Sequence, residues 1–227
     1  MKKILAKYRS LPEAVKASLW FTICSILQKG ISFITVPIFT RMLSTEEYGI
    51  ISLFGAWQSI LTIFATLNLS NQIFNNGMVK YEKDQDGYTT AMLGLSNFAT
   101  ALVFMLYLVF HTALDKIFEL PMSAIIMMFI GFFFSAATSL WTVHQRYKFK
   151  YKLLCFVTLI VSLGSALLGV LFVRLENVGI ARILGDTITI TAIGLLIYVL
   201  IVKKNHELFN VTYWKYALKL DLPLIPH

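Results

Sequence analysis

Six long stretches of apolar residues alternate with short polar or charged segments along the chain. Each stretch holds about 20 residues, enough to cross a hydrocarbon layer about 30 Å thick at about 1.5 Å of rise per residue. Stretches such as Ala124 to Phe134 lack the alternation of transmembrane β-strands. The pattern therefore predicts an all-α membrane protein, a six-helix transmembrane bundle. The predicted helices cover residues 11–43, 44–76, 88–111, 121–143, 151–173 and, from 177 or 179, the segment to 204.

Residues that favour helix ends support these boundaries. Ser44 and Glu47 have the spacing of a capping box at the start of the second helix, and Pro121 suits the first turn of the fourth. The chain closes with Leu-Pro-Leu-Ile-Pro-His, which looks like the opening of another membrane segment. We therefore expect a six-helix lobe over residues 1–205, followed over 206–227 by a cytoplasmic linker and the start of a truncated seventh helix.

Composition and charge agree with a membrane protein. Hydrophobic residues make up 57% of the chain and charged residues 14%, against roughly 25% charged residues in soluble domains. Most of the 20 basic residues precede the first helix, follow the sixth, or lie between helices two and three or four and five. By the positive-inside rule these segments and the N-terminus face the cytoplasm. No nucleic-acid-binding motif occurs, so we expect no nucleic-acid partner.

Catalytic chemistry finds little support in the sequence. The chain has 4 histidines but no HExxH pattern, no repeated carboxylate pair and no nucleophile elbow. Cys24 and Cys155 each lie inside an apolar helix, where a thiol behaves as a small hydrophobe. We therefore expect no disulfide, no metal site and no cofactor, and we predict that the protein is not an enzyme and has no catalytic residues.

Lys29 is the charged residue that lies deepest in a predicted span. A charge at the bilayer centre costs roughly 2.5 to 3.5 kcal/mol on insertion, so such a residue turns toward a wet cavity or a partner. On a helical projection Lys29 shares one face with four polar residues. These are Thr22, Ser25, Ser32 and Thr40. Two interpretations remain open: this stripe lines a functional cavity, or a neighbouring helix neutralises Lys29, with Asp186 as the candidate partner.

Three further groups of polar residues fall in predicted spans. Arg182 and Asp186 are four residues apart and can form an ion pair, either as a structural device or as a gate or ion-coupling site. Amides near the cytoplasmic end of the second helix either contact sugar hydroxyls or simply emerge into water. These amides are Asn68, Asn71, Gln72 and Asn75. The fourth helix carries a weaker stripe: Ser135, Thr138, Ser139, Thr142, Gln145 and Arg146.

Polar stripes on four helices are unfavourable against lipid, so we expect them to turn inward around a hydrated cavity lined by cationic groups. Such a cavity suits an amphiphile with an anionic head: cations attract phosphate, amides contact sugar, and the lipid tail stays in the bilayer. The candidate substrate-binding residues are Lys29, Arg41, Asn68, Asn71, Gln72 and Arg182. Asp186 is the candidate ion-coupling or gate residue.

The segment after the first helix resembles a known family. Its sequence is Arg41-Met-Leu-Ser-Thr-Glu-Glu-Tyr-Gly-Ile-Ile-Ser-Leu-Phe54. It is similar to the segment that joins the first two helices in polysaccharide (O-antigen, capsule or exopolysaccharide) flippases of the multidrug/oligosaccharidyl-lipid/polysaccharide exporter superfamily. Arg41, Tyr48 and Gly49 are the matching positions. The stretches at 29–33 and 184–187 and the closing Leu-Pro-Leu-Ile-Pro-His are also similar to that family.

The resemblance implies a function and a location. Family members have two lobes of six or seven helices and move undecaprenyl-pyrophosphate-linked oligosaccharide from the cytoplasmic to the outer leaflet of the bacterial inner membrane. This chain resembles the first lobe, so the implied partners are lipid-linked oligosaccharide, membrane lipid and a missing C-terminal lobe, because alternating access needs two bodies. Two alternatives remain: an ion-coupled multidrug exporter of the same superfamily, or a non-transporting truncated membrane subunit.

Overall fold

The computed structural model describes residues 12–70, 72–176 and 178–221. All regular secondary structure in these ranges is helical, and six of the helices are long and apolar enough to span a membrane. The all-α, six-span fold predicted from the sequence is confirmed, and the chain is a multi-pass membrane protein. The six are α2 (Glu13–Met42), α3 (Thr45–Thr66), α5 (Gln85–Phe118), α6 (Met122–Tyr147), α7 (Tyr151–Glu176) and α8 (Gly179–Lys204).

Short helices lie between and after the spans. The segment between α3 and α5 contains α4 (Gln72–Lys80) and a 3-10 turn, η1 (Glu82–Asp84). After α8 an extended stretch leads into α9 (Val211–Asp221). The last residues, 222–227, lie outside the described ranges, and with them most of the predicted start of a seventh helix.

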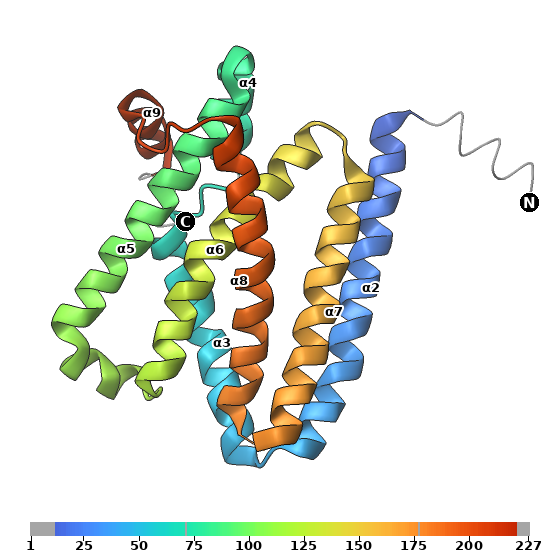
Figure 1. Cartoon of the computed structure of the whole chain (residues 1–227), viewed down its shortest axis with the longest axis vertical. Helices are drawn as coiled ribbons and strands as arrows, with labels where there is room; N and C mark the ends of the chain where they lie inside the picture. The colour runs from blue at the N-terminus through green and yellow to red at the C-terminus, as the bar shows by residue number, and fades with distance from the viewer. Residues whose placement is uncertain (1–11, 71, 177, 222–227) are drawn as a thin grey trace, which may run out of the picture.

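The helix α8 occupies the middle of the bundle (Figure 1), packed against α7 on one side and α6 on the other. On one flank α2 packs chiefly along α7, and on the other α3 and α5 pack on each other and on α6. The α2–α3 and α7–α8 turns lie at one end of the molecule. The start of α2, the α6–α7 connection, α4 and α9 lie at the other end, so the segments predicted to face the cytoplasm lie together.

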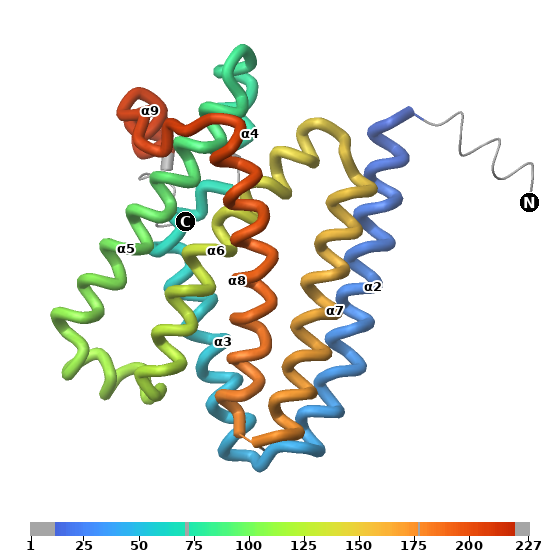
Figure 2. The backbone as a smooth tube through the Cα atoms, in the orientation of Figure 1, coloured from blue at the N-terminus to red at the C-terminus, as the bar shows by residue number. Residues whose placement is uncertain are grey.

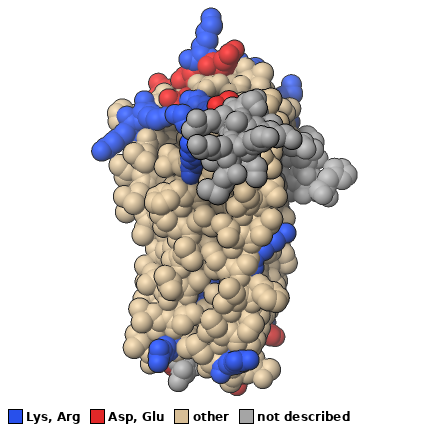
Figure 3. All heavy atoms as spheres, turned by 90° about the vertical axis from the view of Figure 1, so that its right-hand side faces the viewer, with Lys and Arg blue, Asp and Glu red and all other residues tan. Residues whose placement is uncertain are grey.

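The charged residues follow the same division. Figure 3 shows the side of the molecule that α2 occupies: Lys, Arg, Asp and Glu gather at the two ends, and the broad middle is almost entirely uncharged. This distribution is the one expected when the middle faces acyl chains and the ends face the headgroups and water.

The helix ends at the α2–α3 turn have the local chemistry that the sequence indicated. The Ser44 hydroxyl accepts a hydrogen bond from the Glu47 backbone N–H at 3.2 Å, which satisfies one of the unpaired donors of the first turn of α3. The Glu47 carboxylate in turn accepts a hydrogen bond from the Gly179 backbone N–H. A Cβ atom on Gly179 would lie 2.3 Å from the Glu47 carbonyl oxygen. The start of α8 is thus tied to the start of α3.

The third predicted helix is longer than expected. The sequence predicted residues 88–111, whereas α5 begins at Gln85 and continues to Phe118. Backbone angles depart from the helix at Phe110, and Figure 2 shows the last part of α5 bending before the chain leads into α6. The Tyr107 hydroxyl donates to the Asp115 carboxylate at 2.7 Å across this bend, so a side-chain bond holds the two parts together.

The second predicted helix, residues 44–76, was wrong as a single element. The helix α3 ends at Thr66, and Leu67 and Asn68 take left-handed backbone angles, with φ of 51° and 48°. The Thr100 hydroxyl of α5 donates to the Ala65 carbonyl at 2.8 Å, which satisfies a carbonyl of the last turn. Past this break, Leu69 is buried against α5 and α6. Burial of apolar side chains therefore outweighs continuation of the helix.

Several close contacts lie at the end of the bundle that carries α9. The Trp214 indole N–H donates to the Ala91 carbonyl of α5 at 2.8 Å, and the Tyr213 hydroxyl donates to the Asp84 carboxylate at 2.7 Å. A Cβ atom on Gly94 would lie 2.0 Å from the Leu208 carbonyl oxygen, so only glycine permits this approach. These contacts fix the connection after α8 against α5.

Candidate functional site

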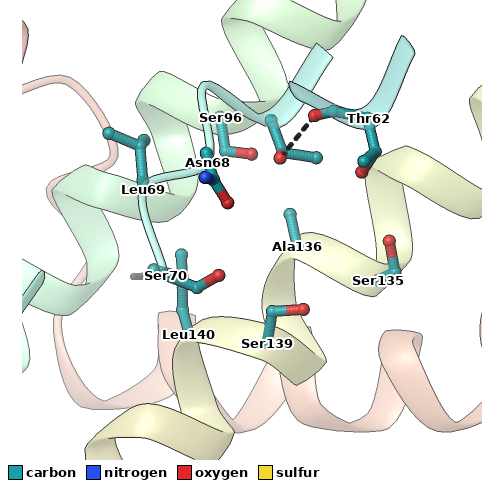
Figure 4. Close-up of a pocket in the computed structure, with 10 residues that line it drawn as sticks. Thr62, Asn68, Leu69, Ser70, Ser96, Ser135, Ala136, Ser139 and Leu140 are labelled. Carbon is teal, nitrogen blue, oxygen red and sulfur yellow. Dashed lines mark hydrogen bonds between the residues drawn. The ribbon is translucent and has the colours of Figure 1, made fainter. Parts of the chain in front are cut away.

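A small polar pocket of about 100 Å³ lies between α3, α5 and α6. Hydroxyl groups and one amide supply most of its polar lining, and its volume accommodates a few water molecules. Figure 4 shows Asn68 projecting from the segment after α3 into the pocket, toward α6. The lining residues are Thr62, Thr66, Asn68, Leu69, Ser70, Ser96, Ser135, Ala136, Ser139 and Leu140.

Some of the hydrogen-bonding capacity of this region is unused. The Thr66 hydroxyl donates to the Thr62 carbonyl at 2.7 Å, as shown by the dashed line in Figure 4. The hydroxyl of Ser96 and both amide atoms of the neighbouring Asn97 are buried with no hydrogen-bond partner in the described part of the chain. Because buried polar groups are normally paired, the Ser96 hydroxyl is suited to hold water or a ligand hydroxyl in the pocket.

Sequence reasoning found part of this pocket and missed the rest. It singled out Asn68 and the α6 residues Ser135 and Ser139, which the structure does bring together. It missed the contribution of α5. The signal was present: Ser96, which lines the pocket, and Thr100, which bonds to the last turn of α3, are one turn apart in an apolar span. A helical projection of this span would have shown them on one face.

Lys29 and the polar residues beside it lie on an exposed face of α2. The residues of this stripe, all exposed, are Thr22, Ser25, Lys29, Ser32 and Thr40. A different side of α2, about 100° around the helix, packs on α7. There the Gln28 amide donates to the Ser162 hydroxyl at 3.1 Å, and Cys24 and Cys155 lie buried as free thiols. The stripe therefore opens on the outside of the described helices and not into a chamber between them, contrary to the arrangement expected from the sequence.

The depth of Lys29 in the membrane follows from its place on α2. It lies about 24 Å from the start and about 20 Å from the end of α2, at about 1.5 Å per residue. Both distances exceed half of a hydrocarbon core about 30 Å thick. Within the described residues no hydrogen bond or ion pair engages its ammonium group. The α2 stripe thus places an unpaired cation near the bilayer centre on a face that no described helix covers.

Arg182 and Asp186 form the ion pair that their spacing predicted, within the first two turns of α8. The Arg182 side chain is 17% exposed and lies 4.7 Å from the centre of the Phe39 ring of α2. One of its guanidinium nitrogens also donates to the Ser165 carbonyl of α7 at 3.5 Å. The pair therefore joins three helices. Since Asp186 pairs with Arg182, it does not serve as the partner of Lys29.

The remaining candidates lie apart from one another. Arg41 is exposed in the last turn of α2, about 18 Å beyond Lys29 at about 1.5 Å per residue. Asn71 lies outside the described residues, and Gln72 begins α4 with its side chain outside the description. The break after Thr66 also means that Asn68 and Asn75 do not share one helical face. The structure therefore distributes the predicted binding residues over the pocket, the α2 stripe and the α2–α3 end.

Comparison with known proteins supplies the family. A family model described as "Polysaccharide biosynthesis protein" matches residues 14–220 of the chain. No curated protein and no solved structure gives a match. The matched range begins in α2 and ends in α9, so it takes in all six spans, the pocket and the α2 stripe. The chain belongs to the polysaccharide biosynthesis protein family.

Proposed function

We propose that the protein moves lipid-linked oligosaccharide, with undecaprenyl pyrophosphate as the carrier, across the bacterial inner membrane. The family gives the protein a role in polysaccharide synthesis or transport, and a bundle of membrane helices suits transport rather than catalysis. The observation that carries the proposal is the α2 stripe with Lys29 at its centre. A lysine near the bilayer centre requires a hydrated or anionic surrounding, and a translocation route for a pyrophosphate supplies both.

The proposed chemistry follows from the charges. A pyrophosphate crossing the membrane loses water, and the Lys29 ammonium offers a charge-assisted hydrogen bond in its place. The Ser and Thr hydroxyls beside it can bond to sugar hydroxyls. The lipid tail remains among the acyl chains, so only the head needs a polar route.

A transport route along α2 needs a second protein surface that faces the α2 stripe. We propose that the α2 stripe faces a second helical lobe, in the same polypeptide or another, and that the two bodies move against each other to expose the stripe to either side. In this arrangement Lys29 is the central substrate contact, and Arg41 meets the pyrophosphate at the α2–α3 end. The Arg182–Asp186 pair holds α8 against α2 and α7 and contributes to binding only indirectly.

The test replaces Lys29 by alanine at the chromosomal locus, so that all native partners are present. Lys29→Ala should lower surface polysaccharide and raise undecaprenyl-linked oligosaccharide in the cytoplasmic leaflet, because the pyrophosphate loses its charged partner. Lys29→Arg should retain most transport. Thr112→Ala, an exposed polar position near the end of α5, serves as the control. Unchanged polysaccharide in Lys29→Ala at normal protein level would refute the proposal.

The same strains separate the two alternatives. An ion-coupled multidrug exporter predicts that deletion of the gene sensitises cells to cationic dyes without accumulation of lipid-linked sugar. A non-transporting subunit predicts that Lys29→Ala and Lys29→Arg behave alike and that only variants that unfold the chain have an effect.

A further inference from the structure

An apolar groove of about 480 Å³ runs along the outer surface between α2 and α7. It is separate from the polar pocket and from the α2 stripe, and the proposed transport does not use it. All but two of its lining residues are apolar. The lining residues are Ile31, Ile34, Thr35, Ile38, Leu163, Ala166, Leu167, Val170, Leu171 and Arg174.

The groove exists because small side chains lie between large ones. Ala166 of α7 is 9% exposed and, with the short Thr35 of α2, leaves the hollow between the helices. Ile34 and Leu167 are 64% and 69% exposed and form rims of the groove. At the end of the groove near the middle of α7, Ser162 directly precedes the first lining residue of that helix and is bonded to the amide of Gln28. The groove thus begins next to this polar contact, and its rims are exposed.

The length of the groove matches one leaflet of a bilayer. From Leu163 to Arg174, α7 rises about 16 Å at about 1.5 Å per residue, close to half of a hydrocarbon core about 30 Å thick. Leu163 lies midway along α7, and Arg174 lies in its last turn. The groove therefore extends from the membrane centre to the headgroup region at the end where the α2–α3 turn lies.

The end of this groove nearest the headgroup region carries a cation. Arg174 is exposed, and no ion pair or hydrogen bond engages its guanidinium within the described residues. An apolar channel one leaflet long with an unpaired guanidinium at the headgroup level is complementary to a lipid: the chain fits the channel, and a phosphate fits the guanidinium.

We propose that the groove is a binding site for one acyl chain of an anionic phospholipid in the leaflet at the α2–α3 end, with its phosphate on Arg174. This site is distinct from the transport route, and it does not depend on the identity of the transported substrate. A resident lipid there packs against both α2 and α7 and so adds contacts that hold α2 to the bundle.

The test measures lipid binding to the purified, delipidated full chain in detergent by native mass spectrometry. The probes are phosphatidylglycerol and phosphatidylcholine with identical acyl chains, and free glycerol phosphate. Phosphatidylglycerol should bind more tightly than phosphatidylcholine, because the choline cation offsets the charge of the phosphate in phosphatidylcholine. Arg174→Ala should weaken phosphatidylglycerol by about tenfold and phosphatidylcholine by less. Lys152→Ala, which removes an exposed cation at the other end of α7, should leave both lipids unaffected.

A second variant tests the groove itself. Ala166→Phe fills the floor and should weaken both lipids by at least about fivefold, whereas Ile160→Phe, at an exposed position of α7 outside the groove, should weaken neither. Circular dichroism and the thermal midpoint verify that each variant is folded. Free glycerol phosphate should not bind measurably.

Four results would overturn the proposal. Equal affinity for the two lipids removes the role of Arg174, and wild-type lipid affinity in folded Ala166→Phe removes the role of the groove. A dimer that Ala166→Phe dissociates in the absence of lipid assigns the groove to a second copy of the chain. Displacement of phosphatidylglycerol by polyprenyl phosphate at far lower concentration assigns the groove to the transported lipid. None of these results bears on whether Lys29 is needed for transport, so the two proposals fail separately.

Discussion

The contact between α7 and α8 makes a sharp prediction about glycine. A Cβ atom on Gly185 would lie 2.6 Å from the backbone nitrogen and 2.8 Å from the Cα atom of Gly169, whereas ordinary contact begins at 3.4 Å. Backbone atoms cannot rotate out of the way as a side chain can. Gly185→Ala therefore forces the two helices apart by roughly 0.8 Å, an overpacking that costs about 1–3 kcal/mol.

A second glycine supplies the control. Gly131 of α6 is buried, yet a Cβ atom there would meet nothing within 4 Å. Gly131→Ala should therefore show only the gain in stability that comes from replacing glycine by alanine inside a helix, up to about 1 kcal/mol. Both alanine variants carry this gain, so the difference between them isolates the overpacking cost. Gly185→Ala should be about 1–3 kcal/mol less stable than Gly131→Ala.

Equilibrium unfolding in mixed detergent micelles, monitored by circular dichroism, measures the unfolding free energies of wild type, Gly185→Ala and Gly131→Ala. The displacement should also disturb the groups beside Gly169, since a Cβ atom there would lie 2.7 Å from the Arg182 side chain. If Gly185→Ala proves as stable as Gly131→Ala, the helices do not touch at their backbones, and the reasoning from close approach is refuted.

Two further predictions concern polar contacts. Asp186→Asn leaves the largely buried Arg182 without its carboxylate and should lower the unfolding free energy by about 1–3 kcal/mol. The double variant Arg182→Gln with Asp186→Asn should recover much of the lost stability. Failure to recover it contradicts the pairing. Burial, followed by the hydrogen bond to Asp84, raises the pKa of Tyr213 from 10.0 to about 12. Because the folded-state pKa is the higher one, the stability advantage of wild type over Tyr213→Phe should be full below about pH 10 and lost as pH rises through about 12. Measurements of the unfolding free energy of both proteins across this pH range check the prediction. An unchanged advantage above pH 12 contradicts it.

Much of the helical framework could be read from the sequence because it depends on local properties. Membrane spans follow from the length of apolar runs, and the start of α3 follows from the Ser44 cap, which the structure contains. The Arg182–Asp186 pair also follows from spacing on one helix. In each case the interacting groups lie within a few residues of one another, so a single segment holds all the information needed.

Other features could not be read in this way because they depend on partners far along the chain. The run after Thr66 has no proline or glycine to mark its break; the break arises where the Thr100 hydroxyl reaches the Ala65 carbonyl and where Leu69 becomes buried. The polar pocket likewise needs α3, α5 and α6 to meet. The lipid groove results from the small side chain of Ala166 opposite Thr35 on another helix.

Lys29 shows the division most clearly. The sequence alone determined that a lysine lies near the middle of the first span and shares a face with hydroxyl residues, because the helical repeat and the rise per residue are constant. Only the tertiary structure decided that α2 packs on α7 through its other face and leaves this one exposed. The physical reason is that a helix has several faces of similar hydrophobicity, and the shapes of its neighbours select which of them is buried.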